Sequence, residues 1–306
     1  MSTAERHPTV HAEVRLPSRA PLAQAELLAF LGRRAVPGVE EATPSGFRRS
    51  LRLRGGAGVV ELEPGEKEFR ARFRLGDPAD LDDAIARTRA LLDLDCDPAA
   101  VRGALAGDGL LGEHVRARPG LRVPGTVDGA ELAVRAVIGQ QISVSGARTI
   151  TARIVQACGE PLLEPVGSVT HAFPSPAALA ALNPDALPMP RARRSALLGL
   201  ARALAGGQIV LDALPGAEHE GTLRELRALP GIGRWTADYV AMRALRDRDA
   251  FLATDLGVRR GLELLGVDGS PRSASERSER WRPFRAYATV HLWTLLGAAT
   301  ASGGGA

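Results

Sequence analysis

The spacing of hydrophobic positions divides the chain into two parts near residue 96. In the first part, apolar residues recur every three or four positions at 21–35 and 80–92, which indicates amphipathic helices. Short stretches around them alternate between apolar and polar residues and are separated by glycine and proline turns, as strands are. The strands are expected at 11–16, 47–53, 58–62 and 68–75. Residues 1–96 are therefore predicted to form a small antiparallel sheet domain with two helices, after a short disordered start.

From residue 97 onward the apolar spacing is helical. Residues 98–118 are expected to form a helix and a connecting segment. Further helices are expected at 127–138, 143–157, 176–183, 191–205, 222–228, 234–245, 256–265 and 280–296. No stretch predicts a strand here: residues 159–176 are expected to be a proline-rich loop, and the glycine-rich tail to be disordered. The predicted fold class is α+β, with an all-helical core over 97–306 following the sheet domain.

The helical pattern is interrupted once inside residues 226–255. Pro230 ends a helix because it lacks an amide proton, and Gly231 and Gly233 supply backbone freedom before the next helix starts. This predicts a helix, a tight Gly-Ile-Gly hairpin and a second helix. The first amides of the second helix are unpaired, and a phosphate can approach them closely where the glycines carry no side chains. Asp255 follows 22 residues after Gly233, behind an apolar pair.

Composition and charge narrow the classes of protein. The formal net charge of +4 and pI near 9.8 permit an anionic partner without requiring one. Two cysteines, Cys96 and Cys158, are too few for a cysteine-ligated iron–sulfur cluster. The first residues lack an apolar signal core, and no run of 18 apolar residues occurs. We therefore expect a soluble, cytoplasmic protein.

The full string from Leu229 to Asp255 is more specific than a turn. Leu-Pro-Gly-Ile-Gly-Arg-Trp-Thr-Ala-x-Tyr, followed by Phe-Leu-x-x-Asp, resembles the helix-hairpin-helix DNA glycosylase superfamily. Within it the chain is most similar to bacterial DNA-3-methyladenine glycosylase II, the AlkA type. Residues 117–144 and 279–293 match further family motifs in the same order, so the resemblance covers nearly the whole chain. It implies a core of two lobes, expected at 126–245 and at 97–125 plus 246–300.

Asp255 is the candidate catalytic group. Cleavage of a glycosidic bond passes through an oxocarbenium-like state, and a buried carboxylate beside it stabilises the positive charge. An N-alkylated purine already carries positive charge and leaves without a proton, so one carboxylate suffices. The alternative, that Asp255 only caps a helix, stays open, and both roles are compatible. Asp238 and Asp249 are weaker candidates, expected to be solvated charges.

Lysine usage bears on the reaction type. Bifunctional relatives carry a hairpin-helix lysine that forms a Schiff base with the sugar. Here that position is Trp235, and Lys67, the only lysine among 39 basic residues, lies in the sheet domain. The resemblance therefore implies a monofunctional enzyme without lyase activity.

The base pocket is expected to be aromatic. Trp235 and Tyr239 lie four residues apart on one helix face, and an electron-rich ring attracts a cationic base by roughly 0.5 to 2 kcal/mol. Trp235, Tyr239, Trp293 and Phe30 match family pocket residues, whereas Tyr287 and Trp281 are expected in the core. The family's tyrosine after the aspartate is replaced by Leu256, which implies a wider or less polar pocket there.

The remaining site predictions concern DNA. Gln141 occupies the position of the family's wedge leucine, which fills the gap left by a flipped nucleotide; the alternative is a solvated turn. Backbone binding is expected from Gly231, Gly233, Arg234 and Thr236, with Arg243, Arg259 and Arg260 as electrostatic support. By resemblance alone, carbonyls of Arg227, Leu229 and Ile232 hold a structural Na⁺ or K⁺.

These observations predict a monomeric, monofunctional DNA glycosylase of base excision repair. It would act on double-stranded DNA containing alkylated purines such as 3-methyladenine, leave an abasic site, need no cofactor for catalysis and have no membrane partner. Two alternatives remain: a glycosylase for oxidised or mismatched bases, and a non-catalytic helix-hairpin-helix DNA-binding module. Asp255 and the clustered aromatic residues favour a glycosylase for alkylated purines over the binding module.

Overall fold

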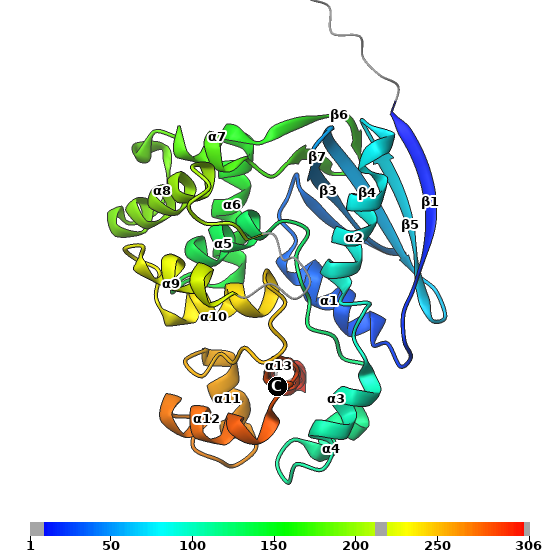
Figure 1. The fold of residues 1–306 in the computed structure, drawn as a ribbon, viewed down its shortest axis with the longest axis vertical. Coiled ribbons are helices and arrows are strands. Elements are labelled where there is room, and N and C mark those ends of the chain that lie inside the picture. The colour runs from blue at the N-terminus through cyan, green and yellow to red at the C-terminus, as the bar shows by residue number, and fades with distance from the viewer. Residues whose placement is uncertain (1–8, 212–218, 303–306) are drawn as a thin grey trace, which may run out of the picture.

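Residues 9–211 and 219–302 are described by the computed structural model (Figure 1); the disordered start and most of the disordered tail predicted above fall outside them. The chain begins with an antiparallel five-stranded sheet in the order β1-β5-β4-β3-β2. Its elements are β1 (Val10–Pro17), α1 (Gln24–Arg34), β2 (Glu40–Thr43), β3 (Gly46–Leu53), β4 (Gly56–Pro64), β5 (Glu68–Leu75) and α2 (Leu81–Leu92). Strand β2 was not predicted, because EEAT at the sheet edge carries no apolar alternation.

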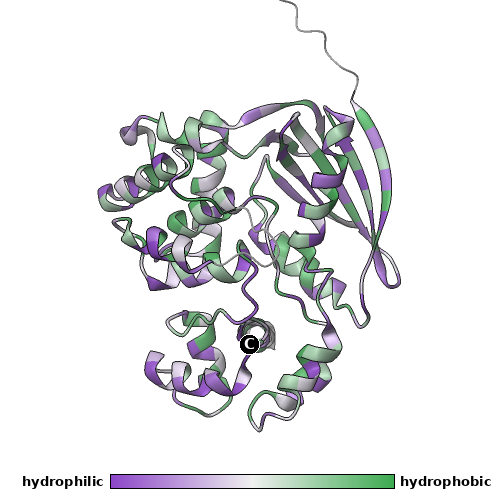
Figure 2. Ribbon diagram, in the orientation of Figure 1, coloured by the Kyte–Doolittle hydropathy of each residue, from purple (hydrophilic) through white to green (hydrophobic). Residues whose placement is uncertain are grey.

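One face of this sheet forms a core with α1 and α2. Phe47, Leu62 and Ala71 occupy successive strands in register, and all three are buried. The strands alternate between hydrophobic and hydrophilic residues along their length (Figure 2). Because side chains alternate across a strand, this register gives the sheet one apolar face for the helices.

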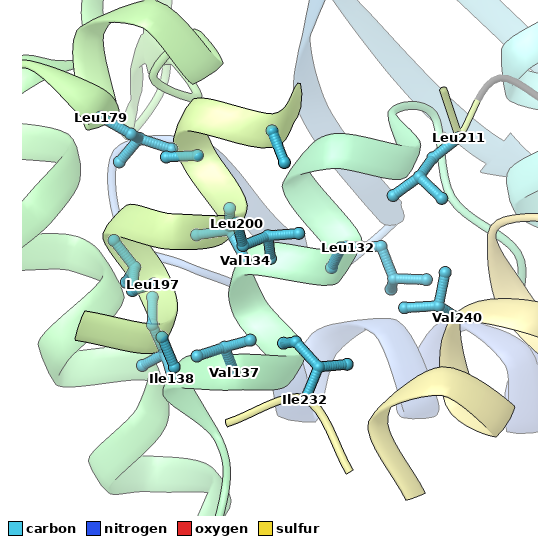
Figure 3. Close-up of a cluster of buried hydrophobic side chains, with 14 of the residues drawn as sticks. Leu132, Val134, Val137, Ile138, Leu179, Leu197, Leu200, Leu211, Ile232 and Val240 are labelled. Carbon is cyan, nitrogen blue, oxygen red and sulfur yellow. The ribbon is translucent and has the colours of Figure 1, made fainter. Parts of the chain in front are cut away.

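The second part of the chain is mainly helical. Its helices are α3 (Pro98–Leu105), α4 (Gly112–Ala117), α5 (Gly129–Ile138), α6 (Val144–Cys158), α7 (Pro176–Ala180), α8 (Arg191–Ala205), α9 (Glu220–Ala228), α10 (Arg234–Arg243), α11 (Leu256–Leu264), α12 (Pro271–Ser278) and α13 (Arg285–Ser302). They enclose two hydrophobic clusters. One lies around α5, α8 and α10, where Val137, Leu197 and Val240 pack (Figure 3), and the other joins α3 and α4 to α11 and α13.

The helical core is present as predicted, but the loop predicted at 159–176 was wrong. Strands β6 (Glu160–Val166) and β7 (Val169–Ala172) form a hairpin beside β3 and β4 (Figure 1). Val166 and Val169 pack on Val59 of the sheet domain, and the Gly38 carbonyl accepts two amide hydrogen bonds from β7. Prolines at 161 and 165 hid the strand in the sequence, since proline is depleted in regular strands.

Helix α12 was also missed, and α13 begins at Arg285 rather than at residue 280. The sequence of α12, PRSASERS, has no apolar periodicity; its available signals were the Ser270 cap and a proline in the first turn. Trp281 and Tyr287 are buried, as expected for core residues. Among the described residues, no helix is long and apolar enough to cross a membrane.

A buried ion cluster fixes the sheet domain to the helical core. The Arg49 guanidinium donates to Glu40 at 2.8 Å and to Glu131 of α5 at 2.7 Å. Arg135 bridges the same two carboxylates and donates to the Arg34 carbonyl at the end of α1. Since these side chains lie on both parts of the chain, the cluster holds α1 against α5.

Candidate active site and DNA interface

The predicted hairpin lies between α9 and α10. Gly231 adopts a φ of +84°, and a Cβ there would lie 2.5 Å from that of Ala196 on α8. Gly233 caps α10 without a side-chain hydrogen bond, and a Cβ there would meet nothing within 4 Å. Gly231 is therefore required by the fold, whereas the space in front of Gly233 and the α10 N-terminus is open to a ligand.

The loop at 139–143 lies beside this hairpin. The Gln140 amide donates to the Gly231 carbonyl and to the Thr236 hydroxyl, both at 3.0 Å. Thr236 is buried, so its hydroxyl contacts Gln140 and is not open to the predicted phosphate. The next residue, Gln141, is exposed and has a φ of +56°, an unusual conformation for a residue other than glycine. Gln140 therefore joins the candidate wedge to the hairpin.

Asp255 caps α11 and also receives two indole hydrogen bonds. Its Oδ1 accepts from the Val258 amide at 3.0 Å and from Trp293 Nε1 at 2.8 Å. Its Oδ2 accepts from Trp235 Nε1 at 2.8 Å. The helix-cap reading is therefore correct in geometry, but the two indoles fix the carboxylate beyond what a cap requires.

Asp255 lies at a cavity of about 1040 Å³ whose wall contains every predicted pocket residue. The rings of Trp235 and Tyr239 stack with centroids 5.1 Å apart, and those of Phe30 and Trp293 stack at 6.0 Å. Leu256 also lines the cavity and is more than half exposed. Helix α1 thus brings the sheet domain into the site through Phe30.

Two of the arginines in this wall, Arg243 and Arg34, contact its aromatic rings. Arg243 is buried and donates to the carbonyls of Pro124 and Gly125 and to the Tyr239 hydroxyl, so it is not exposed in the way that the predicted electrostatic support of DNA requires. The Arg34 Cζ atom lies 3.7 Å from the Phe30 ring centroid. Burial lowers the pKa of Arg34 to about 10. Burial alone raises the pKa of Tyr239, but Arg243 and Arg34 outweigh it and lower that pKa.

The other predicted charges lie outside the cavity wall. Asp238 pairs with Arg227 and Arg234, and Asp249 pairs with Arg282 and Arg285. Burial raises the pKa of Asp238 despite its two arginine partners. Arg259 donates to the Gly269 carbonyl, and Arg260 is exposed. The structure therefore sets Asp255 apart from the other two aspartates.

The proposed cation ligands all belong to the α9–α10 hairpin. The Leu229 carbonyl accepts the Ile232 amide at 3.1 Å, which leaves it a second lone pair. Neutral carbonyl oxygens suit a hard monovalent cation. Within the described ranges, no group of histidine, cysteine or acidic side chains could hold a metal ion.

Sequence reasoning missed Arg34 and underrated Gln140. Arg34 follows Phe30 by four residues on α1, just as Arg243 follows Tyr239 on α10. That spacing places each arginine on the same helix face as its aromatic partner. The signal was therefore present, but it becomes specific only when α1 and α10 are seen to face one cavity.

Comparisons with known proteins cover both parts of the chain. Residues 13–128 match the model of the AlkA N-terminal domain, and residues 134–285 match that of the HhH-GPD superfamily base excision DNA repair protein. A Mycobacterium tuberculosis protein named "Probable bifunctional transcriptional activator/DNA repair enzyme AlkA" is 46% identical over 92% of this chain. The match spans only 57% of that relative's length.

One further sequence relative and one solved structure match over nearly their full length. DNA-3-methyladenine glycosylase 2 of Escherichia coli is 38% identical over 89% of this chain and 93% of its own. The structure of a 3-methyladenine DNA-glycosylase from Archaeoglobus fulgidus superposes with a TM-score of 0.77 at 22% identity, covering 92% of this chain and 97% of that one.

Proposed function

The chain belongs to the HhH-GPD superfamily of base excision DNA repair proteins, and we propose that it is a monofunctional DNA glycosylase for alkylated purines such as 3-methyladenine. The observation that carries the proposal is the position of Asp255. Its carboxylate lies at an aromatic-lined cavity, held by two indole donors that themselves belong to the wall. A DNA-binding module without chemistry has no need of this arrangement.

The environment of Asp255 favours an electrostatic role. Three donors occupy its two oxygens, so the carboxylate is fixed in position before a substrate arrives. A fixed negative charge stabilises a sugar that develops positive charge as the C1′–N bond breaks. Water then adds to C1′ and releases a proton, which leaves an abasic site and an intact strand.

The absence of strand cleavage follows from lysine placement. Lys67, the only lysine, follows β4 in the turn to β5, whereas Trp235 stands where bifunctional relatives carry the Schiff-base lysine. The pocket therefore offers an indole at this position and no amine.

Double-stranded DNA is the proposed partner. Gly233 and the open N-terminus of α10 would receive a phosphate, with Arg234 beside it and a Na⁺ or K⁺ on the hairpin carbonyls. Gln141, held near the hairpin by Gln140, would fill the gap left by the flipped nucleotide. We further propose that the enzyme acts as a monomer in the cytoplasm.

The proposed reaction is tested by incubating the protein with methylated duplex DNA and measuring two products. Free 3-methyladenine should appear, and the strand should stay intact on a denaturing gel until alkali cleaves the abasic site. Strand breaks without alkali would contradict the monofunctional mechanism. Failure to release any base would contradict the glycosylase function.

The wedge role of Gln141 has its own test. Gln141→Ala should bind DNA containing an abasic-site analogue more weakly, by roughly tenfold, because nothing then fills the gap. The single-turnover rate with saturating enzyme should change much less than the affinity. Equal affinity of mutant and parent for the analogue would contradict the assignment.

A further inference from the structure

The cavity wall is polarised, with opposite charges at the two ends of its stacked aromatic pairs. One series runs from Asp255 to the Trp235 indole, on to the stacked Tyr239 ring, and ends where Arg243 donates to the Tyr239 hydroxyl. This series places two rings between the carboxylate and a guanidinium.

A second series starts from the same carboxylate. It runs through the Trp293 indole to the stacked Phe30 ring and ends at Arg34, 3.7 Å from the Phe30 centroid. Arg243 lies 5.0 Å from the same centroid, so the positive ends of both series meet. The two aromatic series therefore share one negative end at Asp255 and one positive end at Arg34 and Arg243, in a cavity whose lining also contains other arginines.

These charges act without a local counter-ion. In the described part of the chain, neither Arg34 nor Arg243 forms a salt bridge; Arg243 donates to two carbonyls and a hydroxyl, and Arg34 to the Phe30 carbonyl. Asp255 in turn is held by neutral donors. With a pKa of about 10, lowered by burial, Arg34 remains a cation at neutral pH.

Breaking the C1′–N9 bond of a cationic purine moves charge along such an axis. The bonding electron pair goes to the base, which becomes neutral, and the positive charge passes to the sugar. A guanidinium at the base end repels the charged ground state, and this repulsion disappears as the charge leaves. The carboxylate at the other end stabilises the sugar cation.

We propose that Arg34, with Arg243 beside it, is a specificity-determining residue that weakens binding of a cationic base but speeds transfer of its charge to the sugar. This inference rests on the proposed glycosylase function. The sequence analysis expected the aromatic pocket to attract a cationic base. The inference modifies that expectation, because Arg34 already covers a face of the Phe30 ring. It also gives helix α1 of the sheet domain a direct part in the reaction.

The experiment compares Arg34→Gln with the parent on two matched probes. Both are duplexes with a 2′-fluoro nucleotide that resists cleavage, one carrying 7-methylguanine and the other unmodified guanine, so that the bases differ by a methyl group and its charge. The ratio of the two affinities measures the charge effect. Single-turnover release of 7-methylguanine from a cleavable duplex measures the rate.

We expect Arg34→Gln to bind the cationic probe several-fold more tightly relative to the neutral one, and to release 7-methylguanine about tenfold more slowly. Arg34→Lys keeps the charge and should behave like the parent. Arg34→Met replaces the guanidinium by an uncharged, apolar side chain and should behave like the glutamine variant. Agreement between the two variants shows that the effect comes from the lost charge and not from a folding defect in one of them. Arg70→Gln, an exposed residue of the same sheet domain, controls for net charge.

A variant that binds the cationic probe more tightly, relative to the neutral one, and releases 7-methylguanine more slowly indicates a charge effect, because a structural defect would weaken both binding and rate. An unchanged affinity ratio, weaker binding of both probes, or a lysine variant that behaves like the glutamine one would overturn the inference while leaving the proposed function in place. Absence of base release by the parent would instead contradict the proposed function, and the affinity ratio would still test Arg34.

Discussion

At the scale of single residues, the candidate chemistry depends on how Asp255 is held. The sequence identified the aspartate and the four surrounding aromatic residues, because each falls in a string that matches the family. It did not show that Trp235 and Trp293 point their N–H groups at one carboxylate, since 20 and 38 residues, respectively, separate them from Asp255. Contacts of this range depend on tertiary packing, which one sequence does not encode locally.

The indole donors can be tested by substitutions that keep the ring. Trp235→Phe and Trp293→Phe should each slow base release by about 10- to 100-fold, because a hydrogen bond to a charged group is lost. Affinity for an abasic-site analogue should change less than the rate, since an aromatic wall remains.

Trp281→Phe is the matched control for the loss of an indole. Trp281 is buried, and its Nε1 has no hydrogen-bond partner within the described structure. At a temperature where the control remains folded, its rate of base release should equal that of the parent. Parent-like rates in both pocket variants would contradict the proposed part of the indoles in catalysis.

At the scale of elements, local signals predicted the hairpin and most helices. Proline and glycine between two periodic segments are sufficient to place α9 and α10, and the family inferred from that string is confirmed. The β6–β7 hairpin was not predictable in this way, because it is stabilised by packing on Val59 and by the Gly38 carbonyl. Strands that depend on a distant partner leave a weak pattern in their own sequence.

The two hairpin glycines should respond differently to alanine. Gly231→Ala should destabilise the fold by about 1 to 3 kcal/mol, since its φ is +84° and a Cβ would lie 2.5 Å from that of Ala196. Gly233→Ala should unfold like the parent, because no atom lies within 4 Å of its added Cβ, yet bind DNA more weakly.

Denaturant unfolding and DNA affinity of both variants check this pair. Ala196→Gly combined with Gly231→Ala should restore part of the lost stability by removing the contact, while the backbone strain remains. If Gly233→Ala bound DNA as tightly as the parent, a phosphate would not approach at this position.

At the scale of the whole molecule, the sheet domain is part of the site. The Arg49 cluster fixes α1 to α5, and α1 then supplies Phe30 and Arg34 to the cavity. The sequence predicted the domain but no chemical role beyond Phe30, because a cavity between distant segments has no local signature. A separate contact joins the end of α2 to α13: the Asp93 carboxylate accepts the Tyr287 hydroxyl at 2.8 Å and the Val123 amide at 3.1 Å.

Asp93 should make stability depend on pH. Burial raises the pKa of Asp93 from the ordinary 3.8 of an aspartate to about 6, so the folded state binds this proton more tightly than the unfolded state. The resulting stabilisation is complete below pH 4 and is lost as pH rises through 6, by up to roughly 3 kcal/mol. Asp93→Asn removes this loss, so the mutant should gain stability relative to the parent between pH 4 and 7.

Unfolding free energies of both proteins across this range give the measurement. Taking the difference between mutant and parent cancels the titration of the other carboxyl groups, which remain in both. A difference that stays constant from pH 4 to pH 7 would contradict the raised pKa of Asp93.

The central claim is that Asp255 stabilises the developing charge on the sugar, and its most direct test is single-turnover release of 3-methyladenine by Asp255→Asn and by the parent. Asparagine keeps an oxygen for the Val258 amide, so the helix cap and the fold should persist. The account predicts unchanged binding to duplex DNA and a loss of base release of about a thousandfold or more. Release at the parent's rate by the asparagine variant would contradict it.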